Sequence, residues 1–330
     1  MPITALDAAT LEKLLSASVA APSIHNTQPW RFRLDRDLAT LEIRAAAGRA
    51  LRHTDPAGRA LHVSVGCALL NLRVAVAHHG WEPVTRLLPR PGEPGLLATV
   101  RIGGPVRFPA LPPRLYDAVW HRHSSRLPFS GRPLPAALFA ELAETAHAEG
   151  ALLSFPGPAE NDRLLDLTQE AEQRNRVDTA RAVESRRWVH EPDGSGLGVP
   201  PEAIGPQDYL GRVPMRDFGA HRHPAVLPAR SFEPRPVLAV LSTAHDRRTD
   251  WLRAGQALEH VLLVATAHGI RTSLLHQALE WPDLRAQLTR IPDDGRVHAQ
   301  MLIRLGYGPQ GPASPRRTVC QTPEEPGSEG

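Results

Sequence analysis

Two stretches of this sequence decide the fold: residues 66–80 read Gly-Cys-Ala-Leu-Leu-Asn-Leu-Arg-Val-Ala-Val-Ala-His-His-Gly, and residues 255–269 read Gly-Gln-Ala-Leu-Glu-His-Val-Leu-Leu-Val-Ala-Thr-Ala-His-Gly. Both begin with Gly, have Ala-Leu at the second and third positions after it, and end in His-Gly. Each is apolar and long enough to be a buried helix that stops at a terminal glycine. Any two buried helices share some features, but the matched positions favour a diverged internal duplication.

The elements predicted around these helices follow the same order in both halves of the chain. We expect an α+β protein in which each half is a mostly antiparallel sheet packed by helices. A capping box at Thr4-Ala-Leu-Asp7 predicts where the first helix begins. The remaining predicted elements are strands over 30–34 and 41–44, a helix over 60–79 and a strand over 96–102, then a helix after Pro135, strands over 152–155 and 237–241, a helix over 251–268 and a strand over 298–305.

The composition excludes several classes of protein. The chain has 330 residues, of which 42% are apolar, and its two cysteines, Cys67 and Cys320, cannot form a disulfide framework or a structural zinc site. No apolar run approaches the ~20 residues of a bilayer span, and the N-terminus lacks the order of a signal peptide. We therefore expect a cytoplasmic protein without a membrane partner.

The charge of the chain does not indicate a nucleic-acid partner. Lys+Arg is 38 and Asp+Glu is 35, which gives a net charge of +3, and Lys13 is the single lysine. No basic tract is interleaved with aromatic residues, so nucleic-acid binding is not expected. The pairs His121-Arg-His123 and His221-Arg-His223 are isolated, and no metal site is expected from them.

The segment Ala21-Pro-Ser-Ile-His-Asn-Thr-Gln-Pro-Trp30 lies between a predicted helix and a predicted strand. Its two prolines fix the backbone, while Ser23, Asn26 and Gln28 carry short side chains with directed hydrogen-bonding groups. The segment has neither a nucleophile beside a base nor the spacing of metal ligands. A capped turn is one explanation for it, and a loop that holds a flat, polar ligand next to the Trp30 indole is another.

Two arginine clusters could bind a phosphate group. Arg122-His-Ser-Ser-Arg126 places two guanidinium groups around two hydroxyls, and Ser314-Pro-Arg-Arg317 follows the last predicted strand. Guanidinium groups match the geometry of phosphate oxygens, and serine hydroxyls can complete the shell. In a chain so rich in arginine, each cluster alone could equally be solvated surface.

Together these segments resemble the FMN-dependent nitroreductase superfamily, over nearly the whole chain outside residues 191–236. That family has an Arg-x-Ser-x-Arg/Lys motif for the FMN phosphate, matched here by Arg122, Ser124 and Arg126. It also has a Pro-Ser-x-x-Asn-x-Gln-Pro-Trp loop over the flavin ring, matched from Pro22 to Trp30. The resemblance therefore implies the cofactor FMN, with NADH or NADPH as co-substrate.

Three further features carry the same resemblance. The family's central helix resembles residues 255–269, and the turn after it, which gives backbone groups to flavin N5 and O4, falls at Leu274 to Gln277. A C-terminal Gly-Tyr followed by basic residues is matched by Gly306-Tyr307 and Arg316-Arg317. The resemblance thus implies these cofactor-binding residues: Pro22, Ser23, Asn26, Gln28, Arg122, Ser124, Arg126, Leu274, Leu275, His276, Arg316 and Arg317.

The order of the motifs departs from the usual family pattern, in which two subunits share two sites. Here the ring loop lies in the first half, while the phosphate motif and the terminal arginines lie in the second. This order is similar to that of the single-chain Acg-like branch and implies an intramolecular pseudo-dimer with one complete FMN site. Such a pseudo-dimer does not need to form a homodimer, but a homodimer is not excluded. The implied parts are a first nitroreductase-like half at 1–112, a second at 113–317 with a lid insertion at 191–236, and a disordered tail at 318–330.

The function that the resemblance implies is oxidoreduction. A nicotinamide would give hydride to FMN and leave, and a small organic acceptor would then take the electrons at the same place. Since the flavin would carry the chemistry, no catalytic side chain is expected. A lid that never opens would instead make the chain an FMN store without turnover, and a specialised flavin oxidase or dehydrogenase is a third hypothesis.

Overall fold

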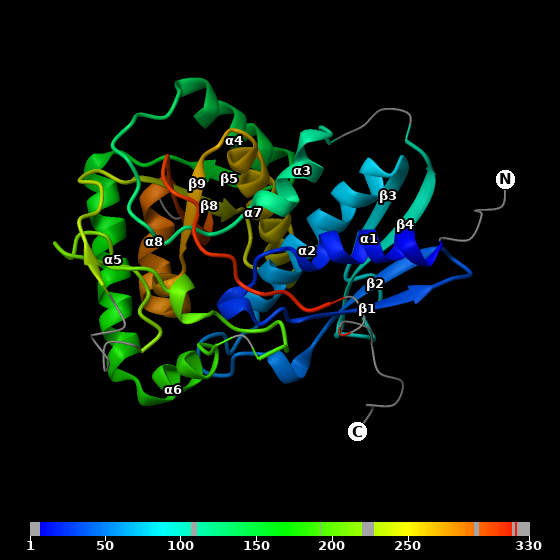
Figure 1. Ribbon diagram of the computed structural model, residues 1–330, viewed down its shortest axis with the longest axis horizontal. Coiled ribbons are helices and arrows are strands. Elements are labelled where there is room, and N and C mark those ends of the chain that lie inside the picture. The colour runs from blue at the N-terminus through cyan, green and yellow to red at the C-terminus, as the bar shows by residue number, and fades with distance from the viewer. Residues whose placement is uncertain are drawn as a thin grey trace.

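The structure is a computed structural model that describes residues 7–106, 111–191, 193–219, 228–293, 297–318 and 321. It has the α+β architecture expected from the sequence, with one four-stranded antiparallel sheet in each half of the chain (Figure 1). The helix α3 (Arg114–His121) connects the two halves.

The first half forms a sheet with two helices packed against it. Its elements are α1 (Ala8–Val19), β1 (Trp30–Asp35), β2 (Thr40–Ala45), α2 (Arg59–His78), β3 (Trp81–Leu87) and β4 (Leu96–Pro105). The strand order is β1-β2-β4-β3. In β1, the side chains of Trp30 and Phe32 are buried while Arg33 is exposed, because successive residues of a strand point to opposite faces.

The second half repeats this arrangement. Its elements are α4 (Ala136–Ala148), β5 (Leu152–Ser154), β8 (Val237–Thr243), α7 (Arg248–Ala267), β9 (Arg271–Leu275), α8 (Pro282–Asp293) and β10 (His298–Gly306). The strand order is β5-β8-β10-β9, which is the same order, element for element, as in the first half. Two tandem halves of one fold predict this correspondence.

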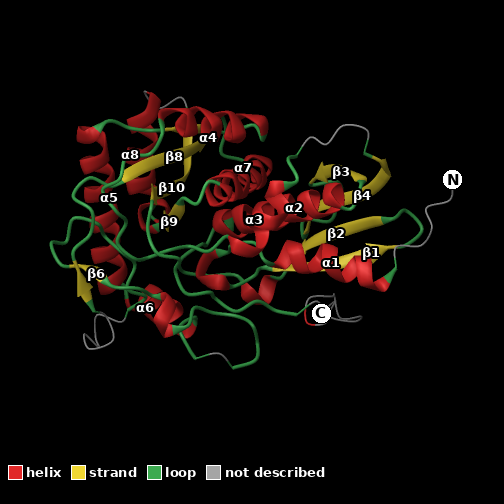
Figure 2. Ribbon diagram, turned by 45° about the horizontal axis from the view of Figure 1, so that its top comes forward, coloured by secondary structure: helices red, strands yellow, loops and turns green. Residues whose placement is uncertain are grey.

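The two apolar helices α2 and α7 cross at the centre of the molecule, and Figure 2 shows them side by side between the two sheets. Gly66 and Gly255, which begin the two matching stretches, face each other at the crossing. A Cβ on Gly255 would lie 2.0 Å from the carbonyl oxygen of Val63 and 2.7 Å from the Cα of Gly66. Only glycine therefore allows this approach, and equivalent residues meet as they do across the two-fold axis of a dimer.

The helix α2 is a core helix. Of the described helices, it alone is long and apolar enough to cross a bilayer, but 89% of its apolar window is buried inside the protein. Gly80 and Gly269 follow α2 and α7 with positive φ angles of 87° and 71°, as expected of glycines that end helices.

A long insertion separates β5 from β8, whereas residues 36–39 alone join β1 to β2. The sequence indicated an insertion that begins at residue 191. In the structure the insertion begins earlier, because two polar helices that were not predicted also lie between β5 and β8. The insertion contains α5 (Pro158–Val177), α6 (Thr179–Arg187), β6 (Gln207–Asp208) and β7 (Ala229–Arg230). We refer to residues 191–236 of it as the lid segment, of which 192 and 220–227 lie outside the described residues.

Three details differ from the sequence expectations. The N-cap of α1 is Asp7, whose carboxylate accepts a hydrogen bond from the Thr10 N–H at 2.7 Å, while Thr4 lies outside the described residues. The strands β3 and β9 were not predicted. The half-exposed residues and Pro83 of β3 hide its strand pattern, and Leu274 and Leu275, which were expected in a turn, belong to β9. The helix α8 was also missed, and most of the tail after Arg317 lies outside the described residues.

Candidate functional site

One pocket collects segments from the whole chain. It lies where the loop after α1, the start of α2, the segment after α3 and the turn after β9 come together, and the lid segment and the C-terminal segment complete its wall. It encloses about 1130 Å³ between atoms, part of it open to solvent. Nine of the twelve cofactor-binding residues expected from the sequence line it: Pro22, Ser23, Asn26, Arg122, Ser124, Arg126, Leu274, His276 and Arg316.

Three expected residues and one expected neighbour lie elsewhere. The side chain of Leu275 is 2% exposed and belongs to the core, and neither Gln28 nor Arg317 lines the pocket. Trp30 is fully buried in the core of the first half and does not line the pocket. The expectation of a ligand next to the Trp30 indole is therefore wrong, because this side chain fills the space between sheet and helices.

The segment Arg122–Arg126 runs as an extended chain along the edge of β9. Ser124 forms a bridge with Thr272, and the Ser125 N–H donates to the Thr272 carbonyl at 2.8 Å. In an extended segment alternate side chains point the same way, which explains the spacing of the motif. Arg122, Ser124 and Arg126 all line the pocket, whereas the Ser125 hydroxyl donates to the Pro309 carbonyl at 3.1 Å.

Buried positive charge accumulates at one end of the pocket. Arg122 and Arg316 each donate an Nη2–H to the carbonyl of Ala20, at 3.2 and 3.3 Å, where the negative end of the α1 dipole lies. Burial, and then repulsion by Arg122, lowers the pKa of Arg316 to about 9. Burial, and then Arg216, lowers the pKa of Arg126 to about 10. In both side chains burial away from water is the larger cause, and a neighbouring guanidinium group is the second.

Two guanidinium nitrogens at this end have no hydrogen bond among the described residues. They are the Nε atoms of Arg122 and Arg316, and both are buried. Arg122 Nε lies 3.2 Å from a carboxylate oxygen of Glu259, without hydrogen-bond geometry. Buried donors of this kind are normally paired, so the arrangement has the properties of an anion-binding site.

The loop 23–28 has a strained backbone. His25, Asn26 and Gln28 have positive φ angles of 49°, 53° and 46°, which are uncommon outside glycine. Two hydrogen bonds hold the loop: the Ser23 hydroxyl accepts from the Gln28 N–H at 2.9 Å, and the Ser64 hydroxyl accepts from the Ile24 N–H at 3.2 Å. Strain of this kind persists where the surrounding structure fixes it, often at binding sites.

The amides of Asn26 and Gln28 tie this loop to two distant segments. Asn26 Nδ2 donates to the carbonyls of Gly198 and Pro315, at 2.7 and 2.9 Å. Gln28 Nε2 donates to the Gly196 carbonyl at 2.6 Å, and its Oε1 accepts from the Arg317 N–H at 3.1 Å. Both side chains were expected to bind the cofactor; Asn26 lines the pocket, and both side chains also fasten the lid segment and the C-terminal segment.

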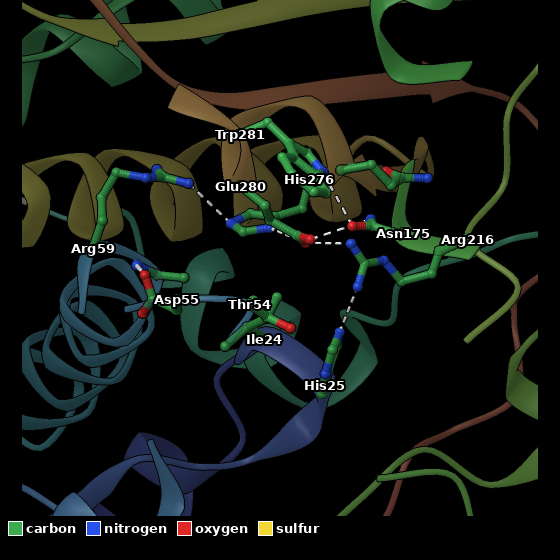
Figure 3. A network of polar contacts seen from close by, with 12 residues as sticks. Ile24, His25, Thr54, Asp55, Arg59, Asn175, Arg216, His276, Glu280 and Trp281 are labelled. Carbon is green, nitrogen blue, oxygen red and sulfur yellow. Dashed lines mark hydrogen bonds and ion pairs between the residues drawn. The ribbon is translucent and has the colours of Figure 1, made fainter. Parts of the chain in front are cut away.

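The lid segment reaches the pocket through a buried polar network that was not predicted (Figure 3). Arg216 Nη1 donates to His25 Nε2 at 2.7 Å, and its Nη2 pairs with the Glu280 carboxylate. The same carboxylate accepts from His276 Nδ1 at 2.9 Å, and His276 Nε2 accepts from Arg59 at 3.0 Å. A guanidinium only donates, so both imidazoles carry their proton on Nδ1.

Both histidines of this network are neutral at pH 7. Burial lowers the pKa of His276 to about 4. Burial, and then Arg216, holds the pKa of His25 well below its usual range. For Glu280, burial alone would raise the pKa, but Arg216 and His276 outweigh it and lower the pKa. The network therefore contains one carboxylate that holds the lid arginine and the turn after β9 together.

Arg126 is shared between the phosphate-type motif and the lid segment. Its Nη1 donates to the Ala203 carbonyl at 2.6 Å, and its guanidinium lies 5.2 Å from the ring centroid of Phe218. Phe218, which has a positive φ of 52°, packs with Val199 and Ile204 in a small core inside the lid segment. The phosphate-type motif is therefore in direct contact with the lid segment through this side chain.

Other chemistry-bearing groups form no further site in the part of the chain that the structure describes. No three His, Cys, Asp or Glu side chains come together there as a set of metal ligands. His221 and His223 lie outside the described residues. Cys67 is buried beside Gly255, whose carbonyl accepts from its thiol at 3.2 Å, and burial raises the pKa of this thiol.

Comparisons with known proteins point in one direction. A Mycobacterium tuberculosis protein named "Putative NAD(P)H nitroreductase" is 33% identical over 331 residues, which cover 97% of this chain and 92% of that protein. A second one, named "Putative NAD(P)H nitroreductase acg", is 29% identical and covers 97% of this chain and 96% of that protein. No family model matches. A crystal structure of "a putative nitroreductase" from Anabaena variabilis has the same fold, with a TM-score of 0.50 at 11% identity over 91% of this chain and 88% of that chain.

Proposed function

Since the chain belongs to the nitroreductase superfamily, we propose that it is an FMN-binding oxidoreductase that uses NADH or NADPH to reduce a small organic acceptor by a ping-pong route. One observation carries the proposal: a single pocket is lined by Arg122, Arg126 and Arg316, and Arg122 is only 3% exposed.

The residues present fit FMN. A phosphate dianion at this end would offset the positive charge of Arg122, Arg126 and Arg316, and it would accept a hydrogen bond from Arg316 Nε, which has none among the described residues. The Ser124 hydroxyl lies on the same side of its segment as the two motif arginines. The remainder of the wall is largely apolar, with side chains such as Val63, Leu258 and Met301, as a flat ring system requires.

When bound, FMN supplies a two-electron carrier that accepts hydride from a nicotinamide and passes it to an acceptor. The chain's own residues bind, orient and shield. The arginine end would anchor the phosphate, and the loop at Pro22 and Ser23 together with the end of β9 at Leu274 would border the ring. His276 sits in that turn with a fixed tautomer between Arg59 and Glu280, so the turn is held rigidly. Rigid donors avoid reorganisation when charge develops during reaction.

The lid segment supports a second candidate function, FMN storage without turnover. Val199, Met215, Arg216 and Phe218 all form part of the pocket wall, and the Arg216 side chain is only 11% exposed. A lid that stays in this position would leave little room for a nicotinamide beside the ring. The choice between the two functions therefore depends on whether the Arg216 contacts open.

We also propose that the working unit is one chain with one FMN. The ring loop exists in the first half alone, and the phosphate-type motif lies in the second half, so the two halves together form one complete site. The parts proposed from the sequence are a first half at 1–112 and a second at 113–317.

The test is an anaerobic absorption spectrum of the purified full-length chain after reconstitution with FMN. Bleaching of the flavin band within seconds of adding NADPH or NADH would support the reductase. A flavin band that dithionite bleaches but neither nicotinamide does would support the store. A chain that does not bind FMN at all would overturn both.

A further inference from the structure

A carboxylate lies behind the arginine end of the pocket, in the middle of α7. Glu259 is fully buried, and its Oε1 lies 3.2 Å from Arg122 Nε. Neither of its oxygens has a partner of good hydrogen-bond geometry among the described residues, although the Asn71 side chain of α2 lies close enough to act as a hydrogen-bond donor that lowers its pKa. Such a group is costly to bury, so its presence needs an explanation other than packing.

The internal repeat shows that packing alone does not require this carboxylate. In the matched stretches that begin at Gly66 and Gly255, Glu259 corresponds to Leu70, which is fully buried and apolar. The two halves thus differ at this position, and the acid occurs in the helix that faces Arg122. The carboxylate therefore belongs with the arginine rather than with the helix crossing.

Two states of the site place different demands on Arg122. Without an anion in the pocket, Glu259 is the nearest partner of the buried guanidinium, with a side-chain exposure of 2% for Arg122 and 0% for Glu259. With a phosphate dianion beside Arg122 and Arg316, two negative groups would share the same dry arginine cluster. Like charges at such distances disfavour ionisation of the weaker acid, here the carboxyl group.

We propose that Glu259 is a proton-accepting positioning residue of the phosphate site: it is the counter-ion of Arg122 while the site is free, and it takes up one proton from solvent when a phosphate ester binds. The inference rests on the proposed FMN site and adds a residue to it. The protonated carboxyl group would then be neutral, and Arg122 would be free to serve the phosphate.

The charge environment makes this proton uptake measurable near neutral pH. Burial raises the pKa of Glu259 to about 7, against the opposing effects of Arg122 and Arg316. The other titratable groups that face it are Arg122 from the segment after α3, Arg316 from the C-terminal segment, with a pKa of about 9, and Cys67 from α2, whose pKa is raised. The phosphate itself is a dianion above pH ~6.5. Between pH ~7 and ~8.5, Glu259 is thus the group that titrates.

The test is calorimetric titration of the flavin-stripped, full-length chain with FMN at pH ~8, in two buffers of different ionisation enthalpy. The difference in heat gives the number of protons taken up per FMN bound. We expect close to one proton for the wild-type chain and an FMN affinity that falls about tenfold per pH unit above pH ~7. Glu259→Gln should bind FMN with no proton uptake and no such slope.

Two controls separate this effect from general changes in the protein. Glu149→Gln removes another buried carboxylate, whose side chain is 7% exposed and pairs with Arg73 at 2.6 Å. Since Glu149 does not line the pocket, this variant should keep the proton uptake. Riboflavin, which has no phosphate, should bind to the wild-type chain without taking up a proton. If Glu259→Gln does not fold, Glu259→Leu, the residue type at position 70, takes its place.

The possible outcomes are distinct. FMN binding to the wild-type chain without proton uptake, or with the same uptake in Glu259→Gln, would overturn this inference and leave the FMN site standing. Failure of the wild-type chain to bind FMN would overturn the proposed function and this inference with it.

Discussion

Removal of the Arg216 side chain, by the substitution Arg216→Met, should release the lid segment. The guanidinium is 11% exposed, pairs with Glu280, which is 1% exposed, and donates to His25 at 2.7 Å. Breaking a buried ion pair costs about 3–5 kcal/mol. Glu280 keeps His276 at 2.9 Å and Arg181 at 3.5 Å as partners, so we expect the lower end, about 3 kcal/mol.

This cost falls on the closed position of the lid, because Arg216 belongs to the lid segment and its partners do not. Each 1.4 kcal/mol is about a factor of ten in an equilibrium constant, so opening of the lid should increase roughly 100-fold. Hydrogen exchange of the amides of residues 208–219, followed by mass spectrometry, should accelerate by about this factor. Arg212→Met is the control, since Arg212 is exposed on the same segment and its side chain has no partner among the described residues.

The same variant distinguishes the two candidate functions. An FMN store should begin to oxidise NADPH when Arg216→Met opens the lid, whereas a reductase should already do so and change little. The reasoning would be refuted by exchange in 208–219 that stays within about threefold of the wild-type rate, with global stability unchanged, because the Arg216 contacts would then not hold the lid.

Three other perturbations test separate parts of the structure. Gly255→Ala should lower the free energy of unfolding by about 3 kcal/mol or more, because the new Cβ would lie 2.0 Å from a backbone oxygen of α2. Urea unfolding measures this loss. The control Gly92→Ala should leave the free energy of unfolding unchanged, because no atom lies within 4 Å of the Cβ it adds. Arg316→Ala should weaken FMN binding about 10- to 100-fold and leave riboflavin binding unchanged, and an equal loss for both ligands would show that Arg316 does not contact phosphate. The pKa of Glu259 in the folded chain, about 7, exceeds the ordinary value of a glutamate side chain, so the folded flavin-free chain binds the extra proton and loses about 3 kcal/mol of stability as pH rises from ~4.5 to ~7. The difference in unfolding free energy between wild type and Glu259→Gln should therefore change across this range, and a constant difference would contradict the assignment.

The parts of the fold that follow local rules could be predicted from the sequence. The apolar stretches of α2 and α7 and their terminal glycines are helix signals that need no knowledge of the fold. The repeat even indicates the crossing, since Gly66 and Gly255 occupy the same position in the two stretches. The helices α5 and α6 were missed because they are largely polar, with few apolar side chains at helical spacing.

The candidate site could be predicted only in its short segments. The spacing of Arg122, Ser124 and Arg126 is a local pattern, and the structure brings all three to one pocket. The network around Glu280 joins residues from the lid, α2 and the loop after α1, and no local pattern specifies such distant partners. The fastening role of Asn26 depends in the same way on Gly198 and Pro315.

One missed residue did have a signal in the sequence. Glu259 is the only acidic residue between Gly255 and Gly269, and a lone charge inside an otherwise apolar helix is rarely buried without a partner. The partner, Arg122, belongs to the phosphate-type motif more than a hundred residues earlier in the chain, which is why the pair became visible only in the structure.

We propose that this chain forms one FMN site whose phosphate end is the cluster of Arg122, Arg126 and Arg316. The most direct measurement is a titration of the flavin-stripped chain with FMN and, in parallel, with riboflavin. We expect one FMN per chain and an affinity for riboflavin that is at least about 100-fold weaker. This ratio corresponds to the free energy of one to two charge-assisted hydrogen bonds to the phosphate. Two FMN per chain, or equal affinity for the two flavins, would contradict it.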